Sequence, residues 1–277
     1  MPIAPAFDPT TGASGGAAPA VASGQGEPLL VLDWAPSGTG GPYAGSYAGV
    51  DHTIAGQVIK VQDKDSGASS VGTVSLEAGG LRIQQTGGSG DPLAIRLDLS
   101  SLTGMAGTYN GLAVNASFSV TTLSQSNASL NMIIHQNMPN QANNANTAFD
   151  MQCQAFRNTA SNYQIKASRW NSASTKTTYS YTASSLTGGG QPANIRLSMF
   201  GTAYQWWIGA DTTAGAGVFQ SVGLGANQRK LVQAQGSGAV IDAGLAYPII
   251  GILVGRGETT PNDLHLTHLK VYTYGNP

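Results

Sequence analysis

Apolar and polar residues alternate along most of the chain after residue 28. In residues 93–99 the apolar side chains fall on one side of an extended chain, at Leu93, Ile95, Leu97 and Leu99, with Arg96 and Asp98 on the other. Residues 111–120 and 194–200 repeat the pattern, with inward positions at Leu112, Val114, Ala116, Phe118, Val120, Ile195, Leu197 and Met199. A period of two with one polar side is typical of antiparallel strands. Glycine-rich turns such as Ala78-Gly79-Gly80 separate the runs, and no window has a sustained helical period with caps. The pattern predicts an all-β sandwich or barrel.

The first 28 residues differ from the rest because they are Ala, Gly, Pro, Ser and Thr with almost no large apolar side chains. Such a segment does not bury enough surface to offset the entropy lost on ordering. We therefore expect an extended assembly arm at 1–28, held by another copy or another protein, and a sandwich at 29–277. Within that sandwich, the Asn- and Gln-rich segment 135–156 is interpreted as a long polar loop.

Composition narrows the classes of function that the chain could have. The chain has 277 residues, 10% of them charged, and a net charge of −1, so a charge-driven nucleic-acid partner is not expected. Its one cysteine, Cys153, does not form an internal disulfide and is interpreted as a small buried hydrophobic residue. No apolar run reaches the roughly 20 residues of a membrane span, and the N-terminus does not resemble a secretory signal. We expect a protein made in a host cytoplasm without membrane insertion.

The order of motifs in the second half resembles a known superfamily. NYQIKASRW and TKTTYSYTA suggest a hairpin, NIRLSMFGTAYQWWIGAD follows, and the last strand contains Leu269-Lys270-Val271-Tyr272. Together these resemble the concanavalin A-like lectin/glucanase superfamily, especially its laminin G-like branch, over residues 110–277. LLVLDWA, at 29–35, would then be a first strand that pairs with the last. The resemblance implies two curved antiparallel sheets in a jelly roll.

Enzyme chemistry is not expected. Glucanases of that superfamily carry paired acidic residues on one strand, whereas none of the three glutamates here has an acidic partner at i+2 or i+4. A distant pair, Asp211 with Asp263, stays open. His265 and His268 are close in sequence, but residues i and i+3 of a regular strand point to opposite faces, and a bulge near Thr267 would explain the shift in apolar phase there. Asp63, Asp65 and Gly67 imitate only the start of a calcium loop. No cofactor and no metal site is predicted.

Exposed aromatic residues are the candidate binding groups. Trp206 and Trp207 are adjacent on a predicted strand, which directs Trp206 inward and Trp207 outward beside Gln205. An aromatic ring beside an amide suits a sugar ring or a partner's pocket, although such a ring is more often covered by a loop or, here, by the arm. Trp170, Tyr179 and Tyr181 complete the candidate glycan- or partner-binding set.

These features favour a non-enzymatic structural protein of a bacteriophage particle. The preferred hypothesis is a capsid decoration or cement protein, a homo-oligomer that contacts the major capsid or tail protein through residues 1–28 and presents a lectin-like sandwich. The alternative is a tail or head fibre module that binds host glycans. Both place the protein in the virion, by analogy with phage proteins of this fold.

Overall fold

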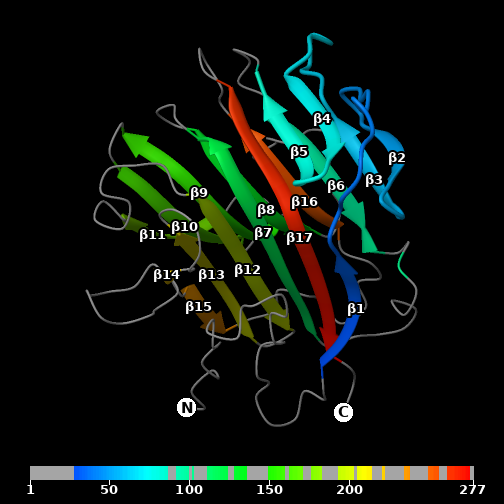
Figure 1. The fold of residues 1–277 in the computed structure, drawn as a ribbon. Coiled ribbons are helices and arrows are strands. Elements are labelled where there is room, and N and C mark those ends of the chain that lie inside the picture. Colours follow the sequence, from blue (N-terminus) through cyan, green and yellow to red (C-terminus); the bar gives the residue numbers. More distant parts are fainter. Residues whose placement is uncertain are drawn as a thin grey trace.

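The computed structural model describes residues 28–86, 92–99, 102, 111–123, 128–135, 149–159, 162–170, 176–182, 193–202, 205–213, 220–221, 234–237, 249–255 and 261–274. These residues form two antiparallel sheets that pack as two layers (Figure 1). The nine-stranded sheet contains β1 (Pro28–Trp34), β4 (Gly72–Glu77), β5 (Gly80–Gln85), β7 (Gly111–Thr122), β12 (Asn194–Thr202), β13 (Gln205–Thr213), β14 (Gln220–Ser221), β15 (Ala234–Ser237) and β17 (Asn262–Tyr274). The eight-stranded sheet contains β2 (Val50–Ile54), β3 (Gln57–Gln62), β6 (Leu93–Asp98), β8 (Ser129–His135), β9 (Phe149–Thr159), β10 (Asn162–Trp170), β11 (Lys176–Thr182) and β16 (Ile249–Gly255).

The order of strands joins distant parts of the chain. In the nine-stranded sheet the order is β14-β13-β12-β7-β17-β5-β4, with β15 beside β13 and β1 beside β17. In the eight-stranded sheet it is β11-β10-β9-β8-β16-β6-β3-β2. The predicted antiparallel two-sheet sandwich is therefore confirmed, as are the pairing of the first strand with the last and the β10–β11 hairpin.

The core lies between the two sheets and follows the predicted alternation. Every inward position named on β7 and β12 is buried, and Phe118 is among the largest side chains that are fully buried. From the other sheet, β6, β8 and β16 contribute alternate leucine, isoleucine and valine side chains, and β9 contributes Cys153. Burial of these side chains against each other is the main force that holds the two layers together.

The strand β17 contains the bulge expected near Thr267. Its pairing with β7 shifts between Leu266 and His268, so Thr267 has no partner on β7. The extra residue restores the apolar phase, because Leu264 and Leu266 before it and Leu269 and Val271 after it are all in the core. Thr267 is held in place by its hydroxyl, which donates to the Ser117 carbonyl oxygen at 3.0 Å.

Two expectations are corrected. The segment 135–156 is not a loop throughout, because Phe149–Thr159 forms β9, with Cys153 in the core and Gln152 less buried. Nor are the outward faces uniformly solvated, because Arg96 on β6 and Asn115 on β7 are buried. The proposed arm, residues 1–28, lies outside the described residues except for Pro28.

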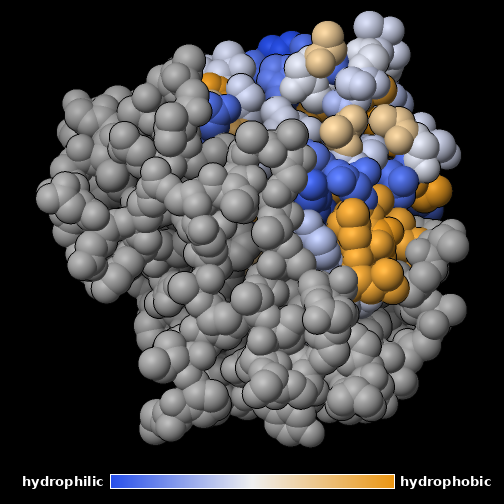
Figure 2. All heavy atoms as spheres, turned by 60° about the horizontal axis from the view of Figure 1, so that its bottom comes forward, coloured by the Kyte–Doolittle hydropathy of each residue, from blue (hydrophilic) through white to orange (hydrophobic). Residues whose placement is uncertain are grey.

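Within the described residues, large hydrophobic side chains are exposed on the edge strands β1 and β2 and on β3, the neighbour of β2. The large exposed side chains are Leu29, Leu30, Val50 and Val58, on β1, β2 and β3. Figure 2 shows hydrophobic residues gathered into a patch beside hydrophilic ones. Among the described residues, no helix is long and apolar enough to cross a membrane.

Candidate functional site

The outer face of the eight-stranded sheet carries a row of side chains set by strand register. Asp51 lies opposite Lys60, Lys60 opposite Arg96, and Arg96 opposite Gly251. Gly251 in turn lies opposite Ile133, and Ile133 opposite Gln152. Residues directly opposite each other on antiparallel strands share a face. The row therefore runs across β2, β3, β6, β16, β8 and β9.

A second row lies beside the first. Gln62 pairs with Ala94, Ala94 with Leu253, and Leu253 with Asn131. The apolar side chains in the middle of both rows, Ala94, Ile133 and Leu253, are buried and pack together. We call the two rows, from Lys60 and Gln62 on β3 to Asn131 and Gln152 on β8 and β9, the Arg96 face.

Amide groups on this face form a hydrogen-bonded chain. The Gln152 Nε2 donates to the Asn131 Oδ1 at 2.7 Å, and the Asn131 Nδ2 donates to the Ser129 hydroxyl at 3.2 Å. On the other side, the Arg96 guanidinium donates to the Gln62 Oε1. Such a series holds amide and guanidinium groups in fixed orientations beside a buried apolar cluster.

Arg96 has few partners within the described part of the chain. The residue is 6% exposed, and no described residue is a hydrogen-bond partner of its Nε. Burial lowers the pKa of the guanidinium from its usual value, since desolvation disfavours the charged form. Toward β2 the row is more exposed to solvent, because the Lys60 side chain is 37% exposed and the Asp51 side chain 58%. The charged groups of these two residues form an ion pair at 2.9 Å.

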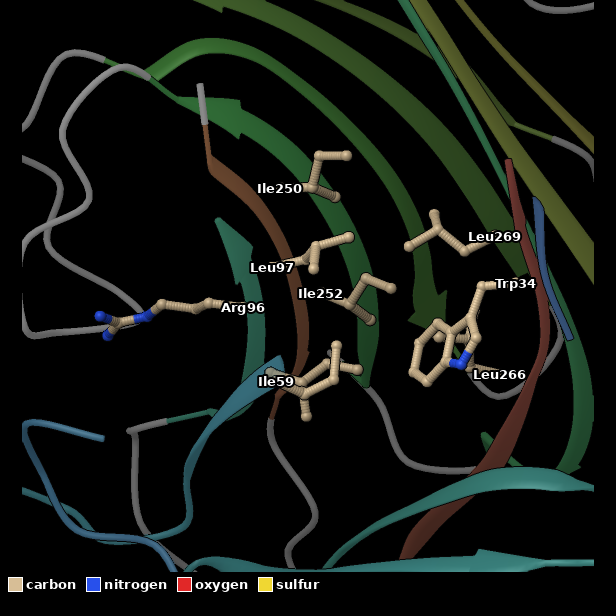
Figure 3. A pocket seen from close by; sticks show the side chains of 9 residues that line it. Trp34, Ile59, Arg96, Leu97, Ile250, Ile252, Leu266 and Leu269 are labelled. Atoms are coloured by element: carbon tan, nitrogen blue, oxygen red, sulfur yellow. The ribbon is translucent and has the colours of Figure 1, made fainter. Parts of the chain in front are cut away.

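A small cavity lies between the described strands of the two sheets. A cavity of about 10 Å³ lies there, lined by Trp34 of β1, Leu266 and Leu269 of β17, and apolar side chains of β3, β6 and β16. Figure 3 shows the charged end of Arg96 directed away from these apolar side chains. A volume of this size holds at most about one water molecule, so this gap belongs to the packing of the core.

The register separates the aromatic residues predicted as binding groups. Gln205 and Trp207 lie on β13, where Trp207 is opposite Phe200 of β12 and Gln235 of β15. Because Met199 is in the core, the alternate position of Phe200 is on the outer face of the nine-stranded sheet, and Trp207 shares that register position.

The other three candidates lie on the eight-stranded sheet. Tyr179 of β11 is opposite Ala167, which is opposite the core residue Cys153, so Tyr179 and Tyr181 occupy positions on the face toward the nine-stranded sheet. Trp170 ends β10 two residues after Ser168, which lies opposite Gln152, so its position is on the outer face of the eight-stranded sheet, beyond the β9 end of the Arg96 face. The five candidates therefore occupy three different faces, and their side chains are outside what the structure describes.

Acidic residues of the nine-stranded sheet form ion pairs. Asp263 accepts hydrogen bonds from the Arg82 Nε at 2.9 Å, the Arg82 Nη2 at 2.6 Å and the Gln84 Nε2 at 3.1 Å. Burial alone raises the pKa of Asp263, but the hydrogen bonds and charge of Arg82 outweigh it and lower the pKa below its usual value. Glu77 also has a lowered pKa, through hydrogen bonds first with His265 and then with Arg82.

The open pair of Asp211 with Asp263 does not suit glycoside hydrolysis. Asp211 is on β13 and Asp263 on β17, and the strands β12 and β7 lie between them. Three strand spacings amount to about 14 Å, and the two carboxyls of a glycosidase lie roughly 5–9.5 Å apart. The backbone positions therefore exclude this pair as a hydrolytic couple.

The two neighbouring histidines have different carboxylate partners. The His265 Nε2 lies 3.3 Å from the Glu77 Oε2, and His268 contacts Asp33 of β1, which also pairs with Lys270 at 3.3 Å. Both histidines are only partly exposed, at 17% and 26% of the side chain.

The acidic segment after β3 is also accounted for by local structure. The Asp65 Oδ1 accepts the Ser69 amide at 2.7 Å, which fixes a turn, and Asp63 is buried. Within the described part of the chain, no three His, Cys, Asp or Glu residues are grouped so that they could hold a metal ion.

Most of the Arg96 face is not recognisable as a site from the sequence. The alternation correctly places Arg96 on the outward side of its strand, but Gln62, Asn131 and Gly251 lie on other strands far apart in sequence. The available signal is weak: a charged or amide residue at an outward position of several strands, and a glycine inside the apolar run IIGILVG.

Comparisons with known proteins find likeness in structure alone. No protein-family model matches the chain, and no curated protein matches its sequence. Among solved structures, it is similar to peanut lectin bound to a nine-residue peptide, with 9% identity, a TM-score of 0.49, and coverage of 89% of this chain and 97% of that one. It is also similar to a legume lectin-like domain from Entamoeba histolytica, with 6% identity, a TM-score of 0.47 and coverage of 74% and 88%.

A phage protein is found as well. The CBM2 module of the evolved Dit of Lactobacillus casei BL23 phage J-1 has 6% identity and a TM-score of 0.42, covering 67% of this chain and 70% of that one. The similar structures thus include lectins, the class to which the sequence shows a resemblance. At these identities and TM-scores, what this chain binds is inferred from its own residues.

Proposed function

We propose that the chain is a non-enzymatic carbohydrate-binding module of a bacteriophage particle, and that a sugar meets the Arg96 face at its less buried ends, Lys60 on β3 and Gln152 on β9, since the side chains between them are buried. The observation that carries the proposal is the pair of rows across the eight-stranded sheet. Sugars present hydroxyl groups and apolar ring faces together, and this face combines amide and guanidinium groups with Ala94, Leu253 and Gly251. Such a combination of a few oriented polar groups and apolar contacts is typical of small-molecule sites.

The carboxylates support binding rather than hydrolysis. A glycosidase needs one carboxyl that stays protonated near neutral pH, which requires a raised pKa. Asp33, Glu77 and Asp263 instead have lowered pKa values, because basic partners stabilise their charged forms against any effect of burial. None of these three carboxyls is suited to act as a general acid.

The aromatic candidates add two finer proposals. Trp170 occupies a position at the end of β10, on the same outer face of the eight-stranded sheet as the Arg96 face, so we assign it as a ring that stacks on a sugar. Gln205 and Trp207 lie on the outer face of the opposite sheet, where they would contact a partner protein or a second copy of the chain.

Placement in a virion rests on the sequence. A segment poor in large apolar side chains leads into β1, and β1 starts at Pro28 beside Tyr274, at one end of the sandwich. Low overall charge weakens repulsion between copies in a dense assembly. A capsid decoration protein and a fibre module could both use such an arm, and the Arg96 face favours a role in which the sandwich meets a glycan.

A glycan array followed by calorimetry on the purified full chain tests the binding role. We expect binding to a restricted set of saccharides, weakened by Trp170→Ala and unchanged by Tyr43→Phe, a conservative change at a partly buried residue that packs against the core. No binding to any saccharide at millimolar concentration would refute it. Immunogold labelling of phage particles tests the placement, and unlabelled particles from a source that makes the protein would refute that part.

A further inference from the structure

Three adjacent strands of the nine-stranded sheet place an aspartate, a lysine and an asparagine in one row. Lys270 of β17 lies opposite Asp33 of β1 on one side and opposite Asn115 of β7 on the other (Figure 1). The residues before and after each of the three are in the core, so all three side chains point to the outer face of the sheet. Directly opposite residues have Cβ atoms about 4.5–5.5 Å apart, so the long side chain of Lys270 can reach both neighbours.

The lysine and the asparagine of this row are buried. Lys270 and Asn115 are each 8% exposed, although lysine is one of the side chains least often buried in proteins. The Lys270 Nζ lies 3.3 Å from the Asp33 Oδ2, and Asp33 also contacts His268. Within the described part of the chain, no residue accepts a hydrogen bond from the Asn115 Nδ2. A nitrogen without such a bond can leave the amide without breaking a described interaction.

We propose that Lys270 and Asn115 form an isopeptide bond, a covalent amide cross-link between β17 and β7, and that Asp33 accepts the proton of the lysine. A lysine amine is a nucleophile once it has lost its proton, and the sheet holds it beside the amide that it attacks. Burial raises the pKa of Asp33, but its contacts with His268 and Lys270 outweigh this and lower the pKa below its usual value. Asp33 is therefore a carboxylate at neutral pH and can take up the proton.

The atoms and protons of this step balance among the three side chains. Asp33 accepts a proton from the Lys270 ammonium, and the neutral Nζ forms a bond to the Asn115 Cγ. The bond between Cγ and Nδ2 breaks, and the nitrogen leaves as ammonia with a second proton from Nζ. Asp33 passes its proton to the ammonia, which departs as ammonium. The chain loses one ammonia, about 17 Da, and one positive charge.

Ser198 of β12 extends the row beyond the asparagine. It lies opposite Asn115 and is 1% exposed, and no described residue is a hydrogen-bond partner of its hydroxyl. Negative charge develops on the oxygen of a carbonyl group under attack, and a hydroxyl donor beside it stabilises that charge. Ser198 is thus placed to assist the attack of the amine on Asn115.

Mass spectrometry of the purified full chain tests the cross-link. We expect a chain about 17 Da lighter than its sequence. Trypsin should release residues 97–157 and 257–277 as one joined product, because the modified Lys270 is no longer a cleavage site. A succinimide at an asparagine also removes one ammonia, but it leaves the two peptides separate. On a denaturing gel, the boiled chain should migrate faster than an unlinked one, since the bond closes a loop of about 155 residues.

Variants test the role of each side chain. Lys270→Arg and Asn115→Ala are each expected to have the full mass, because one lacks the amine and the other lacks the amide. Asp33→Asn should slow formation of the bond by about 100-fold or more, since it removes the proton acceptor. Lys64→Arg is the matched control, at a lysine of the segment between β3 and β4, and should remain about 17 Da lighter than its sequence.

The unaltered chain alone is sufficient to refute the proposal, so the test does not depend on whether the variants fold. A parent chain of full mass, with the two tryptic peptides separate, overturns it. A loss of about 18 Da, with Lys270 joined to the peptide that contains Asp33, also overturns it, because one water is then lost and Asp33 is the acceptor. A link that persists in Asn115→Ala has the same consequence. None of these outcomes bears on the carbohydrate-binding function.

Discussion

Replacing Asp263 with asparagine tests the ion pair that joins β5 to β17. The carboxylate accepts three hydrogen bonds, two of them from Arg82 and one from Gln84. Its side chain is 8% exposed, whereas that of Arg82 is 33% exposed. The asparagine keeps one acceptor oxygen but loses the charge, and Arg82 retains Glu77 as a second partner at 3.2 Å.

The expected loss of stability lies between two limits. Breaking a fully buried ion pair costs about 3–5 kcal/mol, and an exposed pair contributes about 0–1 kcal/mol. Because one partner is buried and the other one-third exposed, we expect the free energy of unfolding to fall by about 2 kcal/mol at pH 7. For a chain of this size that corresponds to a melting temperature lower by roughly 4–8 °C.

The stability difference between the parent and Asp263→Asn should also depend on pH, in a predictable direction. The pKa of Asp263 is lowered in the folded state relative to its usual 3.8, so its contribution is present above the unfolded pKa and is lost as the pH falls through the folded one. The difference between the parent and Asp263→Asn should therefore shrink toward zero as the pH is lowered below about 3.8.

Urea unfolding of both proteins between pH 7 and pH 2.5, followed by tryptophan fluorescence and circular dichroism, measures this difference. Asp51→Asn is the matched control, because that carboxylate also has a basic partner but is 58% exposed, and it should change stability by no more than about 0.5 kcal/mol. A difference for Asp263→Asn that is the same at every pH, or no larger than that of the control, would refute the reasoning.

Three further predictions concern packing and backbone. Phe118→Ala should lower the free energy of unfolding by about 3–5 kcal/mol in urea titrations, because the ring is fully buried between the sheets. Gly80→Ala should lower the melting temperature more than Gly56→Ala, since both residues have positive φ but only the Cβ at Gly80 would come within 2.5 Å of a carbonyl oxygen, that of Leu266; equal melting temperatures would contradict this. Deletion of Thr267 should abolish the cooperative unfolding transition seen by circular dichroism, because without the bulge one half of β17 turns its apolar residues outward; a parent-like transition would show that the register is not fixed there.

Local pattern is sufficient to predict much of the fold. The apolar sides of β7 and β12 follow correctly from the sequence because both strands alternate strictly and one face of each is in the core. The bulge in β17 is also predictable, since one inserted residue is what shifts the apolar phase of a strand from one face to the other. In each case the information lies within a dozen consecutive residues.

Other features depend on contacts between distant strands. The sequence around β9 favours a loop because Asn and Gln dominate it, and the pairing of β9 with β8 and β10 provides the stabilisation that its own composition does not indicate. The Arg96 face likewise joins residues of β3, β6, β8, β9 and β16. A sequence alone does not state which outward residues share a row, so the grouping of Arg96 with Gln62, Lys60 and Gly251 becomes visible only with the register.

The position of β17 has a consequence for how this sandwich is made. The strand lies between β7 on one side and β5 and β1 on the other, although it is the last of the sandwich to be synthesised (Figure 1). Until it leaves the ribosome, β7 has an open edge, and β1 and β5 have no sheet to join. The nine-stranded layer therefore forms after translation of residue 274. Until then, the strands that pair with β17 have unpaired edges, through which they could associate with other nascent chains.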